Sequence, residues 1–174
     1  HRVTDDMISD GTAKNAFLDD VEILSDVDSA VAWAASLDFI NSDRIGIIGF
    51  CMGGRIAWLS AASNKAFKAV VPYYGGNLWT TRGSATTSPY DLAPNIECPM
   101  LFHFGELDQN PSQDDMRKID KHLTELGKPH QFYTYPNADH AFMDFAQPHR
   151  YNKQAADASW PRTVEFFDAH LKHG

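Results

Sequence analysis

The stretch Arg44-Ile-Gly-Ile-Ile-Gly-Phe-Cys-Met-Gly-Gly-Arg55 decides the fold of this chain. Its first half, Arg44 to Gly49, is apolar enough to form a buried strand, and a helix is predicted to begin near Gly53. Between them, Cys51 lies at the centre of a sharp turn, with one glycine two residues before it and another two residues after it. This is the pattern of a nucleophile elbow, in which larger side chains at the two glycine positions would collide with neighbouring backbone.

The elbow predicts a reactive thiol at Cys51. The turn would lift the sulfur above the edge of a sheet, beside the positive end of the following helix, which lowers a thiol pKa and favours the thiolate. Two other interpretations stay open: an inert buried thiol, and a glycine-rich loop that binds nucleotide phosphates. The nucleotide interpretation is disfavoured, because the stretch lacks both a Lys-Ser/Thr pair and a G-x-G-x-x-G pattern. The next predicted strand, residues 69–74, also ends without an acidic residue for a ribose.

Length and composition predict one domain, residues 1–174, with a sizeable core, since the hydrophobic content is 43%. A net charge of -8 argues against nucleic acid or an anionic membrane surface as partner. The sequence shows no apolar run long enough to span a bilayer and no signal-peptide pattern. The two cysteines, Cys51 and Cys98, do not suggest a disulfide framework, so a cytoplasmic location is expected.

Three helices besides the one after the elbow are predicted from apolar spacing. Residues from Phe17 to Ala34 carry an apolar stripe, and the acidic residues 19–28 are expected on the solvated face of that helix. Ser112 and Asp115 predict a capping box for a helix over residues 112–126. The last helix is expected over residues 160–171, with Trp160 and Val164 buried and Pro161 in its first turn.

Apolar runs predict strands over residues 44–49, 69–74, 100–105 and 131–135. These runs are apolar along their whole length, which is typical of a sheet covered by helices on both faces. Strands and helices alternate, so the predicted fold class is α/β with a mostly parallel sheet and right-handed crossovers. Residues 77–98 form a long irregular segment, which in a compact domain is usually functional or mobile.

Two loops after predicted strands supply an acid and a base. Gly105-Glu-Leu-Asp108 follows the strand over residues 100–105, and Asn137-Ala-Asp-His140 follows the last strand. Because loops at the carboxyl ends of parallel strands meet at one edge of the sheet, His140 can take the proton of Cys51, and Asp108 can orient the imidazole. The chain order of nucleophile, acid and histidine is the one α/β-hydrolases use.

Neighbouring residues compete for these roles. Glu106 is a rival for orienting the histidine, and Asp139 is interpreted as a turn residue. His103 lies inside a predicted strand and is interpreted as structural. The histidines show no metal-ligand spacing, so no metal is predicted.

Four motifs together resemble the dienelactone hydrolase family: Gly49-Phe-Cys-Met-Gly-Gly-Arg55, Tyr73-Tyr-Gly75, Gly105-x-x-Asp108 and Asp139-His-Ala-Phe142. The similarity runs from the first predicted helix to the C-terminus. It implies the α/β-hydrolase fold, a triad of Cys51, Asp108 and His140, and hydrolysis of an enol-lactone such as dienelactone, or a related ester, through an acyl-thiol. The backbone N–H of Met52 is the oxyanion donor that the sequence identifies. No metal or organic cofactor is implied.

The substrate pocket is where the sequence departs from the family. The best-known dienelactone hydrolases bind the substrate carboxylate through arginines, one of them four residues after the catalytic histidine, and this position is Asp144 here. Arg82 or Arg150 is a candidate substitute. The side chains expected to line the pocket are Phe50, Trp79, Arg82 and Phe142.

The family also has several strands before the point where this chain starts, including a loop that supplies a second oxyanion donor. Without them, the strand over residues 44–49 would have an unpaired apolar edge. The chain is therefore expected to be the C-terminal portion of a larger hydrolase, with the other strands supplied by a separate chain or segment. Other functions left open are a thioesterase or acyltransferase, an inactive hydrolase-fold fragment that acts as a binding module, and a redox-sensing thiol.

Overall fold

Strands and helices alternate along the chain in the structure, a computed structural model that describes residues 13–15 and 17–172. After a single helical turn at residues 13–15, the elements are α2 (Asp20–Ala35), β1 (Ile45–Phe50), α3 (Met52–Ser63), β2 (Phe67–Tyr73), the 3₁₀ turn η1 (Ala93–Asn95), β3 (Met100–Gly105), α4 (Gln113–Glu125), β4 (His130–Tyr135), α5 (Lys153–Phe167) and the π-helical turn η2 (Asp168–Lys172).

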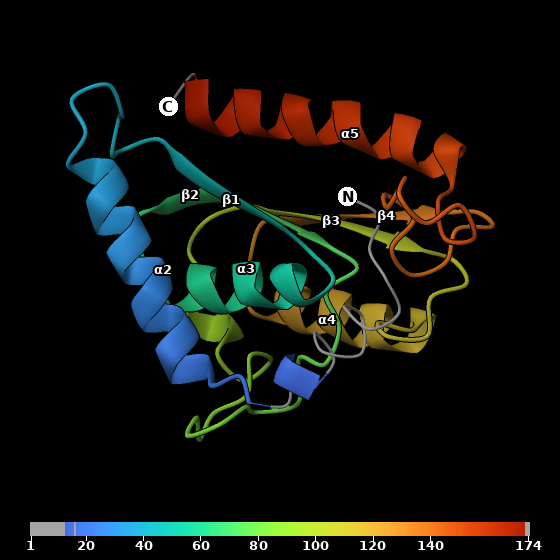
Figure 1. The fold of residues 1–174 in the computed structure, drawn as a ribbon, viewed down its shortest axis with the longest axis horizontal. Helices are drawn as coiled ribbons and strands as arrows, with labels where there is room; N and C mark the ends of the chain where they lie inside the picture. Colours follow the sequence, from blue (N-terminus) through green and yellow to red (C-terminus); the bar gives the residue numbers. More distant parts are fainter. Residues whose placement is uncertain (1–12, 16, 173–174) are drawn as a thin grey trace.

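The four strands form one parallel sheet in the order β1-β2-β3-β4. Helix α5 lies along one face of this sheet, and α3 and α4 lie on the other face with α2 beside them (Figure 1). The predicted α/β class with a parallel sheet between helices is confirmed. Because all four strands run the same way, their carboxyl ends, and the loops that follow them, meet at one edge of the sheet.

The core consists of two apolar clusters, one on each face of the sheet. The first is built from α3, α4 and the strand residues that face them, and it includes Trp58, Phe102 and Leu123. The second lies under α5 and includes Tyr73 and Phe142. Strands β2 and β3 are buried along almost their whole length, as predicted for a sheet covered on both faces.

The prediction for the first helix is partly wrong. Helix α2 begins at Asp20, and Asp19 caps it by accepting a hydrogen bond of 2.8 Å from the N–H of Val21. Phe17 lies before the helix and is 86% exposed, and Val21 is exposed as well. Asp20, which was expected on the solvated face, is 2% exposed because it pairs with a buried arginine described below.

The predicted start of the last helix is also wrong. Helix α5 begins at Lys153, where Asn152 caps it by accepting a hydrogen bond from the N–H of Ala155. Pro161 therefore lies inside the helix. The face that packs on the sheet is made of small side chains such as Ala155 and Ser159, whereas Trp160 is 48% exposed. The capping box of α4, formed by Ser112 and Asp115, is confirmed.

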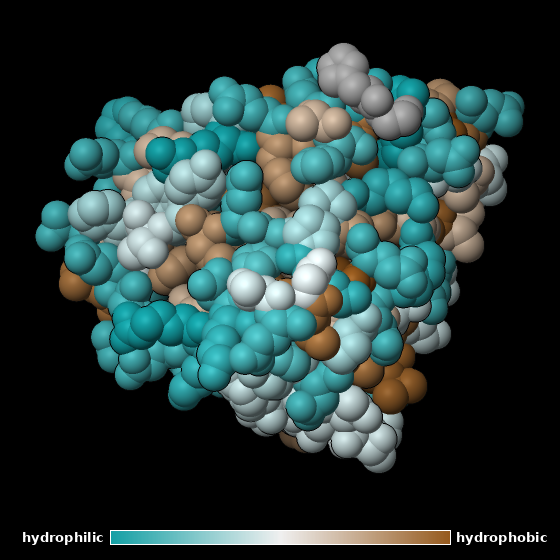
Figure 2. All heavy atoms as spheres, turned by 180° about the vertical axis from the view of Figure 1, so that it is seen from behind, coloured by the Kyte–Doolittle hydropathy of each residue, from teal (hydrophilic) through white to brown (hydrophobic). Residues whose placement is uncertain are grey.

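Strand β1 lies at the edge of the sheet and pairs only with β2 among the described residues. Its first four residues are half-buried, although β1 is as apolar as the inner strands. That a further segment pairs with this edge stays a prediction. Hydrophilic residues cover most of the face opposite the view of Figure 1, and hydrophobic atoms reach it in separate patches (Figure 2). Among the described helices, none is both long and apolar enough to cross a membrane.

Candidate active site

The turn between β1 and α3 places Cys51 at the carboxyl edge of the sheet. Cys51 has φ 55° and ψ -117°, a conformation that side-chain-bearing residues rarely adopt and that is typical of strained turns at functional sites. Its N–H donates to the carbonyl of Tyr73 at 3.0 Å, and its own carbonyl accepts from the N–H of Gly54 at 3.0 Å. These bonds anchor the turn to β2 and to α3, so its strained backbone is held from both sides.

The glycines around the turn differ in what they allow. A Cβ at Gly49 would lie 1.9 Å from the carbonyl oxygen of Gly53, so only glycine fits there. A Cβ at Gly53 would meet no described atom within 4 Å, so the predicted collision at this position is wrong. The close approach is made by Gly54, whose Cβ would lie 2.7 Å from the carbonyl oxygen of Tyr73 on β2.

The structure brings the three predicted triad residues together. The Nε2 atom of His140 lies 3.0 Å from the Sγ atom of Cys51, and its Nδ1 atom lies 2.9 Å from the Oδ2 atom of Asp108. The carboxylate of Asp108 is almost fully buried, whereas the sulfur belongs to an exposed residue. The contacts run without a break from a buried acid to a thiol that a substrate can reach.

These contacts change the protonation of the thiol and the imidazole. The hydrogen bond that His140 donates to Asp108, followed by the one with Cys51, raises the pKa of His140 to about 10. The hydrogen bond with His140 lowers the pKa of Cys51 below its usual 9.0, against the opposing effect of burial. The N–H of Met52 adds to this lowering. Both shifts favour the form of the pair in which a thiolate lies beside an imidazolium.

A second set of contacts fixes Asp108. Its Oδ1 atom accepts a hydrogen bond of 2.8 Å from the N–H of Asn110, so one oxygen is left to face His140. The side-chain oxygen of Asn110 in turn accepts from the N–H of Asn77, at 3.1 Å, in the loop after β2. A Cβ at Gly76 would lie 2.2 Å from that oxygen, which explains the glycine there.

The rival residues have other roles. Glu106 accepts a hydrogen bond of 3.0 Å from the N–H of Asn137, so it holds the loop after β4 and does not orient His140. Asp139 accepts from the N–H of His140, as a turn residue would. His103 is fully buried, with its ring nitrogens on Tyr135 and Thr163, and burial lowers its pKa to about 3.

Two pockets of opposite character meet at Cys51. The larger has a volume of about 570 Å³ and mostly apolar walls, and it is lined by Phe50, Cys51, Tyr74, Ala141, Met143, Asp144, Phe145 and Trp160. The smaller has a volume of about 100 Å³ and is lined by Asn15, Cys51, Met52, Arg55, Gly76, Asn77, Arg82, Asn110 and His140. The sulfur of Cys51 is thus accessible from an apolar side and from a polar side.

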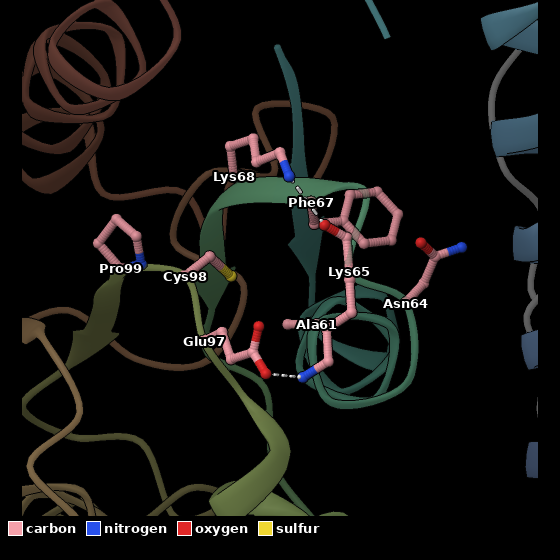
Figure 3. Close-up of a pocket in the computed structure, with 8 residues that line it drawn as sticks. All are labelled: Ala61, Asn64, Lys65, Phe67, Lys68, Glu97, Cys98 and Pro99. Carbon is pink, nitrogen blue, oxygen red and sulfur yellow. Dashed lines mark hydrogen bonds and ion pairs between the residues drawn. The ribbon is translucent and has the colours of Figure 1, made fainter. Parts of the chain in front are cut away.

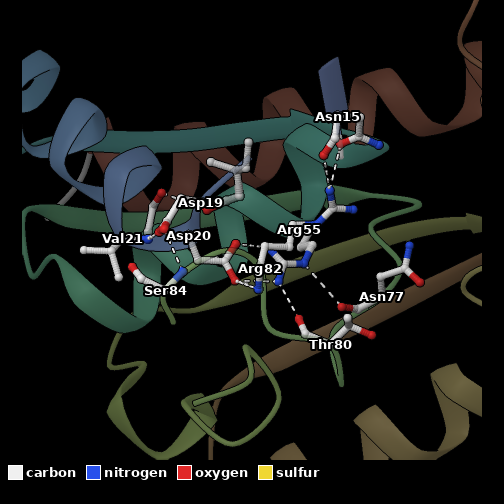
Figure 4. A network of polar contacts seen from close by, with 11 residues as sticks. Asn15, Asp19, Asp20, Val21, Arg55, Asn77, Thr80, Arg82 and Ser84 are labelled. Atoms are coloured by element: carbon white, nitrogen blue, oxygen red, sulfur yellow. Dashed lines mark hydrogen bonds and ion pairs between the residues drawn. The ribbon is translucent and has the colours of Figure 1, made fainter. Parts of the chain in front are cut away.

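A buried ion pair holds the wall of the smaller pocket. The guanidinium of Arg55, one turn into α3, makes two hydrogen bonds to the carboxylate of Asp20, and it also donates to the carbonyls of Asn77 and Thr80 (Figure 4). The N–H of Arg82 donates to the same carboxylate at 3.0 Å. The loop over residues 77–84 is thereby fixed to α2 and to α3.

Of the residues predicted to line the substrate pocket, the structure places two beside Cys51. Phe50 lines the larger pocket and Arg82 the smaller one. Phe142 is fully buried in the core, and Trp79 packs against Tyr90 and lines neither pocket. For these two residues the prediction is wrong, because Phe142 has no exposed surface and the ring of Trp79 packs on that of Tyr90.

Several residues at the pockets were missed from the sequence. Tyr74 could have been found, because it follows directly after β2 at the same edge as Cys51, and its ring contacts that of His140 edge-on with centroids 5.2 Å apart. Burial raises the pKa of Tyr74, so its hydroxyl stays protonated. Phe145 and Trp160 carried no sequence signal, since nothing local shows that α5 reaches the site. Arg150 is exposed and lines neither pocket.

The other cysteine lies far from this chemistry. Cys98 lines a shallow pocket of about 270 Å³ with Lys65, Lys68 and Glu97 at the amino ends of β2 and β3, the edge of the sheet opposite to Cys51 (Figure 3). Lys65 pairs with Glu97 there, and burial raises the pKa of the Cys98 thiol. In the part of the chain that the structure describes, no three His, Cys, Asp or Glu side chains are grouped as metal ligands.

A parallel sheet between helices, with a cysteine elbow, a histidine and an acid at its carboxyl edge, defines an α/β-hydrolase fold. The sequence model of the Dienelactone hydrolase family matches residues 6–171, and this chain belongs to that family. The resemblance read from the four motifs is confirmed.

Relatives agree with this assignment. A protein of Methylorubrum extorquens named "Putative carboxymethylenebutenolidase" is 35% identical over 148 residues, which cover 85% of this chain and 50% of the relative. A Bradyrhizobium protein named "Probable 2-oxo-3-(5-oxofuran-2-ylidene)propanoate lactonase" is 32% identical over 155 residues. These residues make up 88% of this chain and 62% of the relative. The chain spans about half to three fifths of the length of these relatives.

The fold agrees with that of a solved family member. The crystal structure titled "Putative Dienelactone Hydrolase" from Klebsiella pneumoniae superposes with a TM-score of 0.78 and 33% sequence identity, and it covers 86% of this chain and 61% of that one. The α/β-hydrolase fold of this chain is therefore supported by its sequence family and by its structure.

Proposed function

We propose that this chain carries the catalytic residues of a carboxylic ester hydrolase that cleaves an ester or an enol-lactone through an acyl-thiol on Cys51. The observation that carries the proposal is the continuous contact from Asp108 through His140 to Cys51 at the carboxyl edge of the sheet. Membership of the dienelactone hydrolase family and the names of its relatives support the same reaction class.

The reaction proceeds in two halves. The Cys51 thiolate attacks the ester carbonyl, and the N–H of Met52 donates to the oxyanion that forms. The imidazolium of His140 protonates the departing oxygen as the C–O bond breaks, which leaves an acyl-thiol and a neutral imidazole. His140 then takes a proton from water, the hydroxide attacks the acyl group, and the C–S bond breaks to restore the thiolate and the imidazolium.

Asp108 acts through His140. It holds Nδ1 of the imidazole, which directs Nε2 at the sulfur and stabilises the positive charge. The same acyl-thiol would serve acyl transfer, but no described residue near Cys51 marks a site for an acceptor other than water. Hydrolysis is therefore the function proposed.

Turnover of p-nitrophenyl acetate and of a neutral enol-lactone tests the proposal. Replacing Cys51 by Ala is expected to lower kcat by at least about a thousandfold, because the nucleophile is lost. The matched control is Cys98→Ala, which removes the other thiol at the opposite edge of the sheet and is expected to keep the parent rate. Equal rates in the parent and in Cys51→Ala would refute the proposal, and products with an added alcohol or thiol would reassign the protein to acyl transfer.

A further inference from the structure

The larger pocket at Cys51 has the size and surface of a site for a small organic group. Its volume of about 570 Å³ lies within the range of roughly 300–1,000 Å³ that is usual for small-molecule sites. Its walls come from the end of β1, the residue after β2, the segment 141–145 and helix α5. Phe50, Met143 and Trp160 give these walls aromatic and thioether surface, which favours an apolar group.

The charge of this pocket is negative. Among the described residues that line it, Asp144 is the one ionisable side chain besides Cys51 and Tyr74. Hydrogen bonds of 3.1 Å from the N–H of Ala146 and 3.0 Å from the side-chain amide of Gln147 hold the two oxygens of Asp144 in place. No arginine, lysine or histidine lines this pocket among the described residues, so a carboxylate that entered it would face a fixed like charge.

The smaller pocket cannot take a bulky group. At about 100 Å³, it has room for only a few heavy atoms beside Cys51 and the N–H of Met52. The guanidinium of Arg55 is already bound to Asp20 and to two carbonyls. Arg82 directs a terminal nitrogen to the backbone and side-chain oxygens of Asn15. The smaller pocket therefore fits a small polar part of an ester, and the larger pocket fits a larger apolar part.

We infer that this site selects neutral esters whose larger portion is aromatic or alkyl, and that it discriminates against esters carrying a carboxylate. The apolar portion lies between Phe50, Met143 and Trp160, the reacting carbonyl lies at Cys51, and Asp144 rejects the anion. This inference rests on the proposed hydrolysis and specifies its substrate class. When the aromatic portion is the alcohol, it leaves as a phenol that takes its proton from His140.

A pair of esters that differ in one charge tests the inference. Methyl 4-acetoxybenzoate is neutral, and 4-acetoxybenzoate has a carboxylate at the same position. Each kcat/KM is divided by the rate at which hydroxide hydrolyses the same ester, which removes differences in intrinsic reactivity. The neutral ester is expected to be preferred by at least about tenfold. Equal values, or a preference for the anion, would overturn the inference.

Two variants assign the selectivity to this pocket. Asp144→Asn is expected to raise the ratio of anionic to neutral kcat/KM about fivefold, because it removes the like charge and keeps the shape. Trp160→Ala is expected to lower kcat/KM for methyl 4-acetoxybenzoate about tenfold, and to lower it less for the small ester vinyl acetate. The control is Trp33→Ala on α2, which removes an exposed tryptophan outside both pockets. It is expected to change neither the ratio of anionic to neutral kcat/KM nor the ratio of kcat/KM for methyl 4-acetoxybenzoate to that for vinyl acetate.

Mass spectrometry of the acylated protein separates failure of the inference from failure of the proposed function. Brief mixing with p-nitrophenyl acetate is expected to add one acetyl group to the peptide that contains Cys51, and none in Cys51→Ala. Acetylation of Cys51 without selectivity between the two benzoates would overturn the inference alone. Absence of acetylation together with absence of turnover would overturn the proposed function and, with it, the inference.

Discussion

Cys51 illustrates how a single residue combines strain and chemistry. A positive φ at a side-chain-bearing residue costs roughly 1–3 kcal/mol, and the hydrogen bonds of its own N–H and carbonyl hold it there. The same turn points the sulfur toward His140, 3.0 Å away. The residue is reactive because the backbone places it beside a base, and the glycine at position 49 permits that backbone.

The pH dependence of Cys51 alkylation follows from this contact. The pKa of His140 is raised to about 10 and that of Cys51 is lowered, so the thiolate is expected to persist below pH 9 and the imidazolium up to about pH 10. In a Cys98→Ala background, the rate of reaction with iodoacetamide is expected to rise with a midpoint below pH 9. Replacing His140 by Ala removes the main cause of the lowered pKa, so the midpoint is expected to move upward.

Iodoacetamide reacts with the thiolate without needing a proton from His140, so this measurement reports the thiol pKa and not the hydrolytic mechanism. A midpoint that is the same with and without His140 would show that the imidazole does not set the protonation of Cys51. The variant Glu106→Gln is the matched control, since Glu106 lies near the same loop but does not contact His140.

At the scale of the elements, the position of the loop over residues 77–84 depends on α2 and α3. Gly83 has φ +62°, and a Cβ there would lie 2.3 Å from the carboxylate of Asp19, whose Oδ2 atom accepts from the N–H of Ser84 at 2.6 Å. With the bonds of Arg55, these contacts tie three segments that are distant in sequence (Figure 4). The smaller pocket at Cys51 exists because this loop is held in place.

Breaking the buried ion pair is expected to destabilise the fold strongly. Arg55 and Asp20 are 1% and 2% exposed, so Asp20→Asn leaves a buried guanidinium without its counter-charge and is expected to lower the free energy of unfolding by roughly 3 kcal/mol. Urea unfolding measures this change. Glu97→Gln breaks the exposed pair with Lys65 and is the control, with an expected loss of less than about 1 kcal/mol. Equal losses in the two variants would contradict a structural role for the buried pair.

For the whole molecule, the sequence predicted best what depends on local pattern and strand order. Cys51, Asp108 and His140 follow three strands of a parallel sheet, and the geometry of such a sheet brings strand ends together. The burial of Asp20 could not be predicted, because it depends on the path of an irregular loop that has no periodicity. The start of α5 was missed because Ala155, Ala156 and Ser159 give little hydrophobic signal, although small side chains let that helix lie close to the sheet.

The net charge of the chain adds a long-range effect to the local one of Asp144. With a net charge of -8, the chain repels anionic esters before they reach the site. Salt weakens this repulsion, because the Debye length falls from about 30 Å at 0.01 M salt to about 8 Å at 0.15 M. Raising the salt concentration over this range is expected to increase the ratio of kcat/KM for 4-acetoxybenzoate to that for its methyl ester about twofold. The neutral ester serves as the internal control, because its encounter with the protein carries no charge term.

The direction of this salt effect discriminates between two ways in which the site can treat an anion. If the repulsion by the net charge and by Asp144 dominates, the ratio of kcat/KM for 4-acetoxybenzoate to that for its methyl ester rises with salt concentration. In Asp144→Asn, this ratio is then expected to rise less steeply with salt. If the positive charge of Arg82 in the smaller pocket dominates, salt screens an attraction and the ratio falls. A falling ratio would therefore contradict the selection of neutral esters and would make Arg82 the residue that binds a substrate carboxylate beside Cys51.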